Sequence, residues 1–178
     1  MEVAEAVEMT AQAEVRTTQI ADAGERKDMD NALGRAGKYL TFKLAEEEYG
    51  LEILKVREII GLMDITAVPR TPGFIRGVIN LRGKVIPVVD LRTKFGMETH
   101  QDTDETCIIV VDVASSENAD MMGILVDTVS EVLDIAVNEI EDTPTFGASV
   151  DMDFILGIGK VNGQVKILLD IDKVLTGS

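Results

Sequence analysis

The sequence has few of the side chains that most often carry catalysis, disulfide bonding or metal binding. It contains no tryptophan, one cysteine and one histidine, and only 4% of its residues are aromatic. A lone cysteine cannot form an intramolecular disulfide, which suits a reducing compartment. Cys107 opens an apolar segment, so we expect a buried structural thiol rather than a nucleophile. His100 lies among flexible carboxylates in an acidic linker, so we expect a solvated loop rather than a metal site.

Positive charge and long apolar runs are also scarce. Lysine and arginine number 17 against 32 acidic residues, a formal charge of -15 at pH 7, so nucleic acid and anionic membrane surfaces would be repelled. The longest aliphatic stretch, residues 108–111, is far short of the roughly 20 residues of a membrane-spanning helix. The first residues lack the basic start and apolar core of an export signal. We therefore expect a cytoplasmic protein with no cofactor, no nucleic-acid partner and no membrane insertion.

The beginning of the chain differs in composition from the rest. Residues 1–37 contain no aromatic residue and no proline, and are rich in alanine, acidic residues, threonine and glutamine. A segment of this kind buries too little apolar surface to fold on its own. We predict a disordered or transiently helical N-terminal extension there, followed by a folded domain over residues 38–175.

From residue 38 onward the pattern is that of β-strands. In residues 39–44, Tyr39, Thr41 and Lys43 alternate with the apolar residues Leu40, Phe42 and Leu44. This period of two predicts a half-buried strand. Later runs rich in valine and isoleucine also predict strands. These runs cover residues 49–53, 77–81, 84–90, 106–113, 121–132, 155–161 and 164–169. Tight hairpins are expected at Arg82-Gly83 and Asn162-Gly163, and short helices only after Asp90 and Asp170. The fold class is mainly β.

The most informative feature is an internal repeat. Residues 74–95 align without gaps with residues 154–175, eighty positions later, and six positions are identical. Residues 50–59 match residues 123–132 at an offset of seventy-three. Because the two matches occur in the same order, the chain contains two copies of one small β unit. Each unit has the size of a five-stranded barrel, which would hide its strand edges.

Positive charge gathers in one stretch of this acidic chain. Between residues 70 and 94 there are six basic residues and one acid, a charge able to steer an acidic protein partner. Most of these side chains are expected simply to face water. Arg82 differs, because its counterpart in the second copy is Asn162, whereas Glu58 is matched by Glu131. We hypothesise an ion pair between Glu58 and Arg82 that is particular to the first copy.

Several segments together resemble the CheW family of chemotaxis coupling proteins. They are Tyr39-Leu40-Thr41-Phe42, Val56-Arg57-Glu58-Ile59, the run from Phe74 to Gly83, the run from Val85 to Arg92, and the run from Met122 to Asp127. The resemblance covers nearly all of residues 38–175, and its most specific part is residues 74–92. It implies two tandem SH3-like five-stranded barrels packed together, with a crossover of the chain between them possible, and an adaptor without a reaction of its own.

The resemblance also implies partners and a site. In this family the cytoplasmic tip of a chemoreceptor docks in a groove between the barrels, and the regulatory domain of the histidine kinase CheA binds elsewhere. This would place the protein at membrane receptor arrays. By motif, the groove positions correspond to Val56, Glu58, Gly77, Arg82 and Val129. The residues of the kinase interface are not assigned.

Two other functions stay open at this point. The same fold would also serve a different chemosensory array, such as one that controls pilus motility. A barrel that binds or converts an anionic metabolite at the basic stretch would need convergent polar groups in an apolar pocket. The sequence shows no such set.

Overall fold

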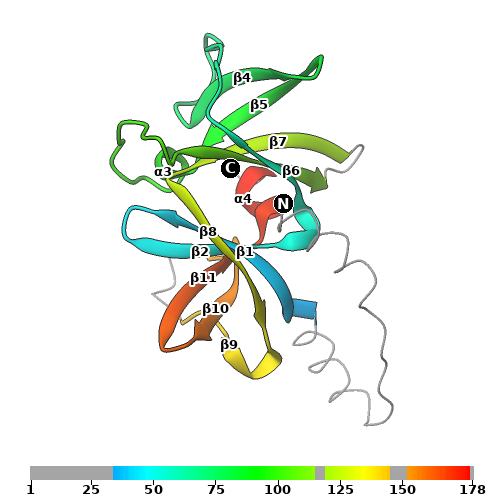
Figure 1. Ribbon diagram of the computed structural model, residues 1–178, viewed down its shortest axis with the longest axis vertical. Helices are drawn as coiled ribbons and strands as arrows, with labels where there is room; N and C mark the ends of the chain where they lie inside the picture. The colour runs from blue at the N-terminus through cyan, green and yellow to red at the C-terminus, as the bar shows by residue number, and fades with distance from the viewer. Residues whose placement is uncertain (1–33, 115–118, 145–151, 177–178) are drawn as a thin grey trace.

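The computed structural model describes residues 34–114, 119–144 and 152–176. This part of the chain is mainly β, with strands β1 to β11 in two sheets and a few short helices, which confirms the predicted fold class (Figure 1). Among the described residues, no helix is long and apolar enough to span a membrane. The predicted N-terminal extension lies outside the described residues, apart from its last four.

The first sheet has the strand order β8-β1-β2-β11-β10-β9. Its strands are β1 (Gly37–Leu44), β2 (Glu47–Glu52), β8 (Thr128–Ile135), β9 (Ile140–Glu141), β10 (Ile155–Val161) and β11 (Gln164–Leu169). Neighbouring strands are antiparallel except β2 and β11, which pair in parallel. A short 3-10 helix, η2 (Val137–Glu139), precedes β9.

The second sheet has the strand order β3-β6-β7-β5-β4. Its strands are β3 (Val56–Gly61), β4 (Ile75–Leu81), β5 (Lys84–Asp90), β6 (Cys107–Ala114) and β7 (Ala119–Val126). Here β5 and β7 are the parallel pair. A 3-10 turn, η1 (Ile53–Lys55), connects β2 of the first sheet with β3 of the second.

The two copies of the repeat exchange strands. The first copy gives β1 and β2 to the first sheet and β3 to β5 to the second, whereas the second copy gives β6 and β7 to the second sheet and β8 to β11 to the first. The chain crosses between the sheets at η1 and returns at Asp127, between β7 and β8. The structure thus differs from the simplest expectation, in which each copy closes on itself, because each sheet combines strands of both copies.

Corresponding hairpins of the two copies have the same geometry. In the β4-β5 hairpin the φ angles of Arg82 and Gly83 are 53° and 87°, and in the β10-β11 hairpin those of Asn162 and Gly163 are 52° and 77°. Two successive positive φ angles define the type I′ turn that suits the twist of paired strands. Both predicted tight turns are confirmed.

A short helix follows each hairpin, as the sequence predicts. The two helices are α3 (Leu91–Lys94) and α4 (Ile171–Thr176). Asp90 Oδ1 accepts a hydrogen bond from the backbone N–H of Arg92 at 3.0 Å, and Asp170 Oδ1 accepts one from Lys173 at 3.3 Å. These aspartates satisfy amides that lack a partner within the helix.

Alternate residues of the central strands build separate hydrophobic clusters. On β6, Ile108 and Val110 face a cluster inside the second sheet, whereas Ile109 and Val111 face the layer between the two sheets. The cluster between the sheets takes buried residues from strands of both sheets and from both helices, and α4 lies there in Figure 1. Burial on both faces explains why β6 is apolar without alternation.

The few aromatic residues are concentrated at this junction. The rings of Phe42 and Tyr49 in the first sheet stack at 5.9 Å, Tyr49 stacks on Phe95 at 5.9 Å, and Phe95 stacks on Phe154 at 5.5 Å. Such ring pairs stabilise beyond the area they bury. Four aromatic side chains therefore link both copies of the repeat.

The strand prediction is wrong in several details. Tyr39 and Thr41 of the predicted half-buried strand are 1% and 0% exposed, so this strand is buried on both faces. The short strand β9 is not among the predicted runs. The run over residues 121–132 is not one strand, because it breaks at Asp127 into β7 and β8, which belong to different sheets. The strand β3 is not among the predicted runs, although its residues match β8 in the repeat. The tertiary fold, rather than the local pattern, determines these features.

Candidate functional site

The hypothesised ion pair between Glu58 and Arg82 is present. Nη1 of Arg82 donates to Oε1 of Glu58 at 2.6 Å, and Nη2 donates to Oε2 at 2.8 Å. The hydrogen bonds from Arg82 lower the pKa of the Glu58 carboxyl, and the carboxylate in turn raises the pKa of the guanidinium. The Arg82 side chain is 70% exposed and that of Glu58 28%, so this planar, two-bonded pair is held in a fixed geometry on the surface.

The β4-β5 turn that carries Arg82 is itself fixed by a side chain. Asn80 Oδ1 accepts a hydrogen bond from the backbone N–H of Gly83 at 2.8 Å. Arg82 has a left-handed backbone conformation, φ 53°, which costs energy for a residue with a Cβ atom. The ion pair with β3 and the bond from Asn80 together hold Arg82 in place.

Gly77 lies where another segment of the chain crosses β4. Its φ is 146°, and a Cβ atom there would lie 2.2 Å from the carbonyl oxygen of Thr66. The strand register shifts between Ile75 and Gly77, and the equivalent shift in β10 lies between Ile155 and Gly157. The two copies therefore share a bulge at this glycine, and Gly77 is required for backbone geometry.

The two predicted groove valines belong to the layer between the sheets. Val56 begins β3 and is 2% exposed, within the cluster that joins the sheets. Val129 lies on β8, is partly buried and packs against the same cluster. The structure therefore brings these two valines to one layer, and separately brings Glu58 and Arg82 together on the second sheet.

Three of the six basic residues in the stretch from residue 70 to residue 94 form ion pairs within the chain. Arg76 Nη2 donates to Asp102 Oδ2 at 2.7 Å, while Arg82 and Arg92 bind other carboxylates. Lys94 lies 3.9 Å above the centre of the Phe74 ring. Because these cations point to separate partners, they do not form the convergent set that an anionic metabolite would need.

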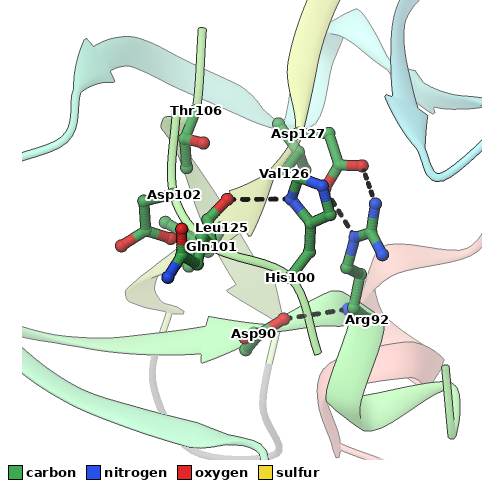
Figure 2. Close-up of a pocket in the computed structure, with 9 residues that line it drawn as sticks. All are labelled: Asp90, Arg92, His100, Gln101, Asp102, Thr106, Leu125, Val126 and Asp127. Atoms are coloured by element: carbon green, nitrogen blue, oxygen red, sulfur yellow. Dashed lines mark hydrogen bonds and ion pairs between the residues drawn. The ribbon is translucent and has the colours of Figure 1, made fainter. Parts of the chain in front are cut away.

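Figure 2 shows a small polar pocket where α3, the linker before β6 and the end of β7 meet. Arg92 Nε donates to Oδ1 of Asp127 at 2.8 Å, and its Nη2 donates to Oδ2. Burial opposes ionisation of Asp127, but the hydrogen bonds from Arg92 and from the Ala45 backbone outweigh it and lower the pKa. His100 Nδ1 donates to the carbonyl of Gln101 at 2.8 Å. The contact between Arg92 and Asp127 was not predicted from the sequence.

The two reactive side chains noted in the sequence have unremarkable surroundings. Cys107 is 9% exposed, and burial raises the pKa of its thiol, so the expected buried thiol is confirmed. His100 is exposed. Within the described residues, no three histidine, cysteine, aspartate or glutamate side chains are placed to hold a metal ion.

The protein is a two-barrel β scaffold. Its two sheets exchange strands and share one hydrophobic core, and the Glu58–Arg82 ion pair lies on its surface. A family model described as a CheW-like domain matches residues 38–178, and the chain belongs to that family. It is 38% identical over 139 residues to the chemotaxis protein CheW of Klebsiella aerogenes, with 78% of this chain and 81% of that protein covered. It is 34% identical over 135 residues to the chemotaxis protein CheW of Rhizobium meliloti, covering 76% and 84%.

A solved structure gives the same result. The scaffolding protein TtCheW of Thermoanaerobacter tengcongensis matches with a TM-score of 0.70 and 38% identity, over 79% of this chain and 93% of that chain. The SH3-like barrels and the role of a chemotaxis adaptor, predicted from the sequence, are confirmed. CheW-family proteins are non-catalytic adaptors, and the relatives do not favour the alternative array.

Proposed function

We propose that this protein is a cytoplasmic adaptor that joins chemoreceptors to a CheA-like histidine kinase. The chemoreceptor cytoplasmic tip docks along the groove positions Val56, Glu58, Gly77, Arg82 and Val129, and the regulatory domain of the kinase docks on another surface. CheW-family proteins couple chemoreceptors with CheA in general. The protein thereby associates with receptor arrays without entering the membrane.

The observation that carries this proposal is the exposed pair of Arg82 and Glu58. Arg82 is in a strained turn, bound through two hydrogen bonds, and still presents most of its side chain to solvent. An arginine held in one conformation loses little entropy on binding, and arginine is enriched among the residues that dominate interfaces. Val56 and Gly77 are buried, so their part is to shape the backbone of β3 and of the β4-β5 hairpin, which carry Glu58 and Arg82.

Coupling requires more than simultaneous binding. A scaffold shifts a kinase between two states only if its contacts differ between those states. The shared core between the sheets makes both barrels one body, so a displacement at the receptor surface is transmitted to the surface that holds the kinase.

Arg82→Ala tests the groove directly. We expect the affinity for a purified receptor cytoplasmic fragment to fall about tenfold or more, with the melting temperature nearly unchanged, as measured by isothermal titration calorimetry and thermal unfolding. Lys160→Ala is the matched control, because Lys160 forms an exposed ion pair with Glu141 on the first sheet, at 2.8 Å. Full receptor affinity in a folded Arg82→Ala variant would contradict the groove assignment.

A further inference from the structure

A polar side-chain pair lies at each of the two places where the chain crosses between the sheets. We call these pairs, Lys55–Asp172 and Arg92–Asp127, the clamps. The first crossing passes through Lys55 at the end of η1, and the second passes through Asp127 between β7 and β8. At each crossing a side chain binds the first turn of a short helix, and the carboxylate of the pair also accepts a backbone hydrogen bond from the end of a strand hairpin.

The clamp at the second crossing is centred on the carboxylate of Asp127. Arg92 of α3 donates to both of its oxygens, with the Nε bond at 2.8 Å (Figure 2). The backbone N–H of Ala45, just after β1, donates to Oδ2 at 2.8 Å, and the N–H of Asp127 itself donates to the carbonyl of Lys43 at 3.1 Å. Asp127 therefore links the β1-β2 hairpin of the first sheet to the helix that follows the second sheet's β5.

The clamp at the first crossing is centred on the carboxylate of Asp172. Lys55 Nζ donates to Oδ2 at 2.6 Å, and the backbone N–H of Ala114, at the end of β6, donates to Oδ1 at 2.9 Å. Asp172 is in the first turn of α4. It links the β6-β7 hairpin of the second sheet to the turn that leaves the first sheet.

The two clamps occupy equivalent places in the repeat but with opposite charges. Arg92 and Asp172 lie eighty positions apart, the offset of the helix-bearing segment, and both are in the first helical turn. At an offset of seventy-three, the partner Lys55 falls beside Asp127, at residue 128. In the second-crossing clamp the helix supplies the cation, and in the first-crossing clamp it supplies the carboxylate. The side chain of each helix is therefore complementary in charge only to the residue at its own crossing.

Both clamps adjoin residues of the proposed receptor groove. Lys55 directly precedes Val56, and Glu58 follows on the same strand, whereas Asp127 precedes Val129 by two residues. We propose that the two clamps position the beginnings of β3 and β8, and thereby set the shape of the receptor groove. This inference rests on the proposed function.

The clamps are better suited to fix the position of the strand ends than to hold the two sheets together. The apolar layer between the sheets holds them together, but burial of apolar surface is not directional. The clamp side chains are 14% to 29% exposed, so their charge-assisted bonds are only partly screened by water and have defined directions. Loss of one cation leaves the carboxylate bound to a single backbone N–H, and the adjoining strand end becomes freer to open.

Amide hydrogen exchange on the full chain tests the inference. Arg92→Met and Lys55→Met remove the cation and keep an aliphatic side chain. We expect Arg92→Met to speed exchange several-fold at the start of β8 and not in β3, and Lys55→Met to do the reverse. Lys160→Met, which breaks an exposed pair on the first sheet, should change neither region. Equal exchange in wild type and variants at both strand starts would overturn the inference.

Receptor affinity separates this inference from the proposed function. We expect both clamp variants to bind the receptor fragment several-fold more weakly, while the Lys160→Met control binds normally. If the Arg82→Ala variant loses affinity and the clamp variants do not, the groove stands and the positioning inference is overturned. If none of these variants loses affinity, the groove assignment fails, and the exchange data alone then decide whether the clamps hold the strands.

Discussion

At Arg82 the backbone conformation and the side-chain contact favour different residue types. Its φ of 53° favours asparagine or glycine, and the equivalent residue of the other hairpin is Asn162, at φ 52°. The first copy keeps an arginine in this position, bound to Glu58. The pair was predicted by comparing the two copies. The second copy has Asn162 at this position, so the repeated fold does not require an arginine, and Arg82 must have a role particular to the first copy.

Arg82→Asn should separate stability from function. The substitution creates an Asn-Gly turn like the one already present at residues 162–163, so we expect a melting temperature no lower than that of wild type. Binding of the receptor fragment should be lost to the same extent as in Arg82→Ala. A markedly lower melting temperature would show that the ion pair, rather than the turn geometry, decides the stability of this hairpin.

Glu52 predicts a pH dependence of stability. Burial raises the pKa of its carboxyl, and the nearby Asp170 and Asp172 raise it further against the opposing charge of Lys55. The folded state therefore favours the protonated form. Its contribution to stability is complete below the unfolded-state pKa and is lost as the pH rises through the folded-state pKa.

Glu52→Gln should accordingly raise the free energy of unfolding at pH 7, and the gain should shrink toward zero at acidic pH, where Glu52 is protonated in both states. Urea unfolding of wild type and variant at pH 7 and at pH 4 measures both values. An equal effect at the two pH values would mean that the change acts through packing and not through charge.

At the scale of elements, the two parallel strand pairs differ in one buried position. Lys166 on β11 is 3% exposed and binds Glu48 on β2, its register neighbour. The repeat offsets place Ile86 and Met121 at the equivalent positions of β5 and β7, and both pack in the cluster inside the second sheet. One sheet therefore has an ion pair where the other has two apolar side chains of one cluster.

Single and double substitutions at this pair should have very different effects. Lys166→Ile alone removes the buried cation bound to Glu48, whose carboxylate keeps only its hydrogen bond with Ser130, and should cost about 3 kcal/mol of unfolding free energy. Lys166→Ile combined with Glu48→Met copies the apolar pair of the other sheet and should recover most of that loss. Urea unfolding measures both, and a double variant as unstable as the single one would contradict this explanation.

The positions of the strands were easier to predict from the sequence than the sheets to which the strands belong. The Asn-Gly turn before β11 is a local signal, and the structure bears it out. The strand β1 forms as predicted but is not half-buried, because Leu40 and Phe42 pack in the layer between the sheets and Tyr39 packs in a cluster inside the first sheet. The break at Asp127 was not predicted, because β7 and β8 are both apolar enough to read as one run. The clamps depend on residues far apart in sequence, and only the opposite charges at Arg92 and Asp172 within the repeat indicate them.

At the scale of the whole molecule, the exchange of strands joins the two barrels into one unit. Neither copy of the repeat forms a complete sheet by itself, and the layer between the sheets is built from both. The repeat predicted two barrels but not this exchange, because the local pattern of a β-hairpin is the same whichever sheet it joins.

Unfolding should therefore be a single transition. We expect Phe95→Ala, at the centre of the aromatic stack between the copies, to cost about 2 to 4 kcal/mol. Both sheets should lose stability together, so that calorimetric and van't Hoff enthalpies stay equal. Two resolved transitions, or loss of protection confined to one sheet in hydrogen exchange, would show that the barrels fold independently.

In the function proposed above, one small two-barrel body holds a receptor and a kinase at the same time. Size-exclusion chromatography with light scattering, on this protein mixed with a chemoreceptor cytoplasmic fragment and a CheA-like kinase of the same organism, tests it most directly. We expect the wild-type protein to form a complex that contains all three components, and the Arg82→Ala variant to form a complex with the kinase alone. A wild-type protein that binds neither the receptor fragment nor the kinase would contradict it.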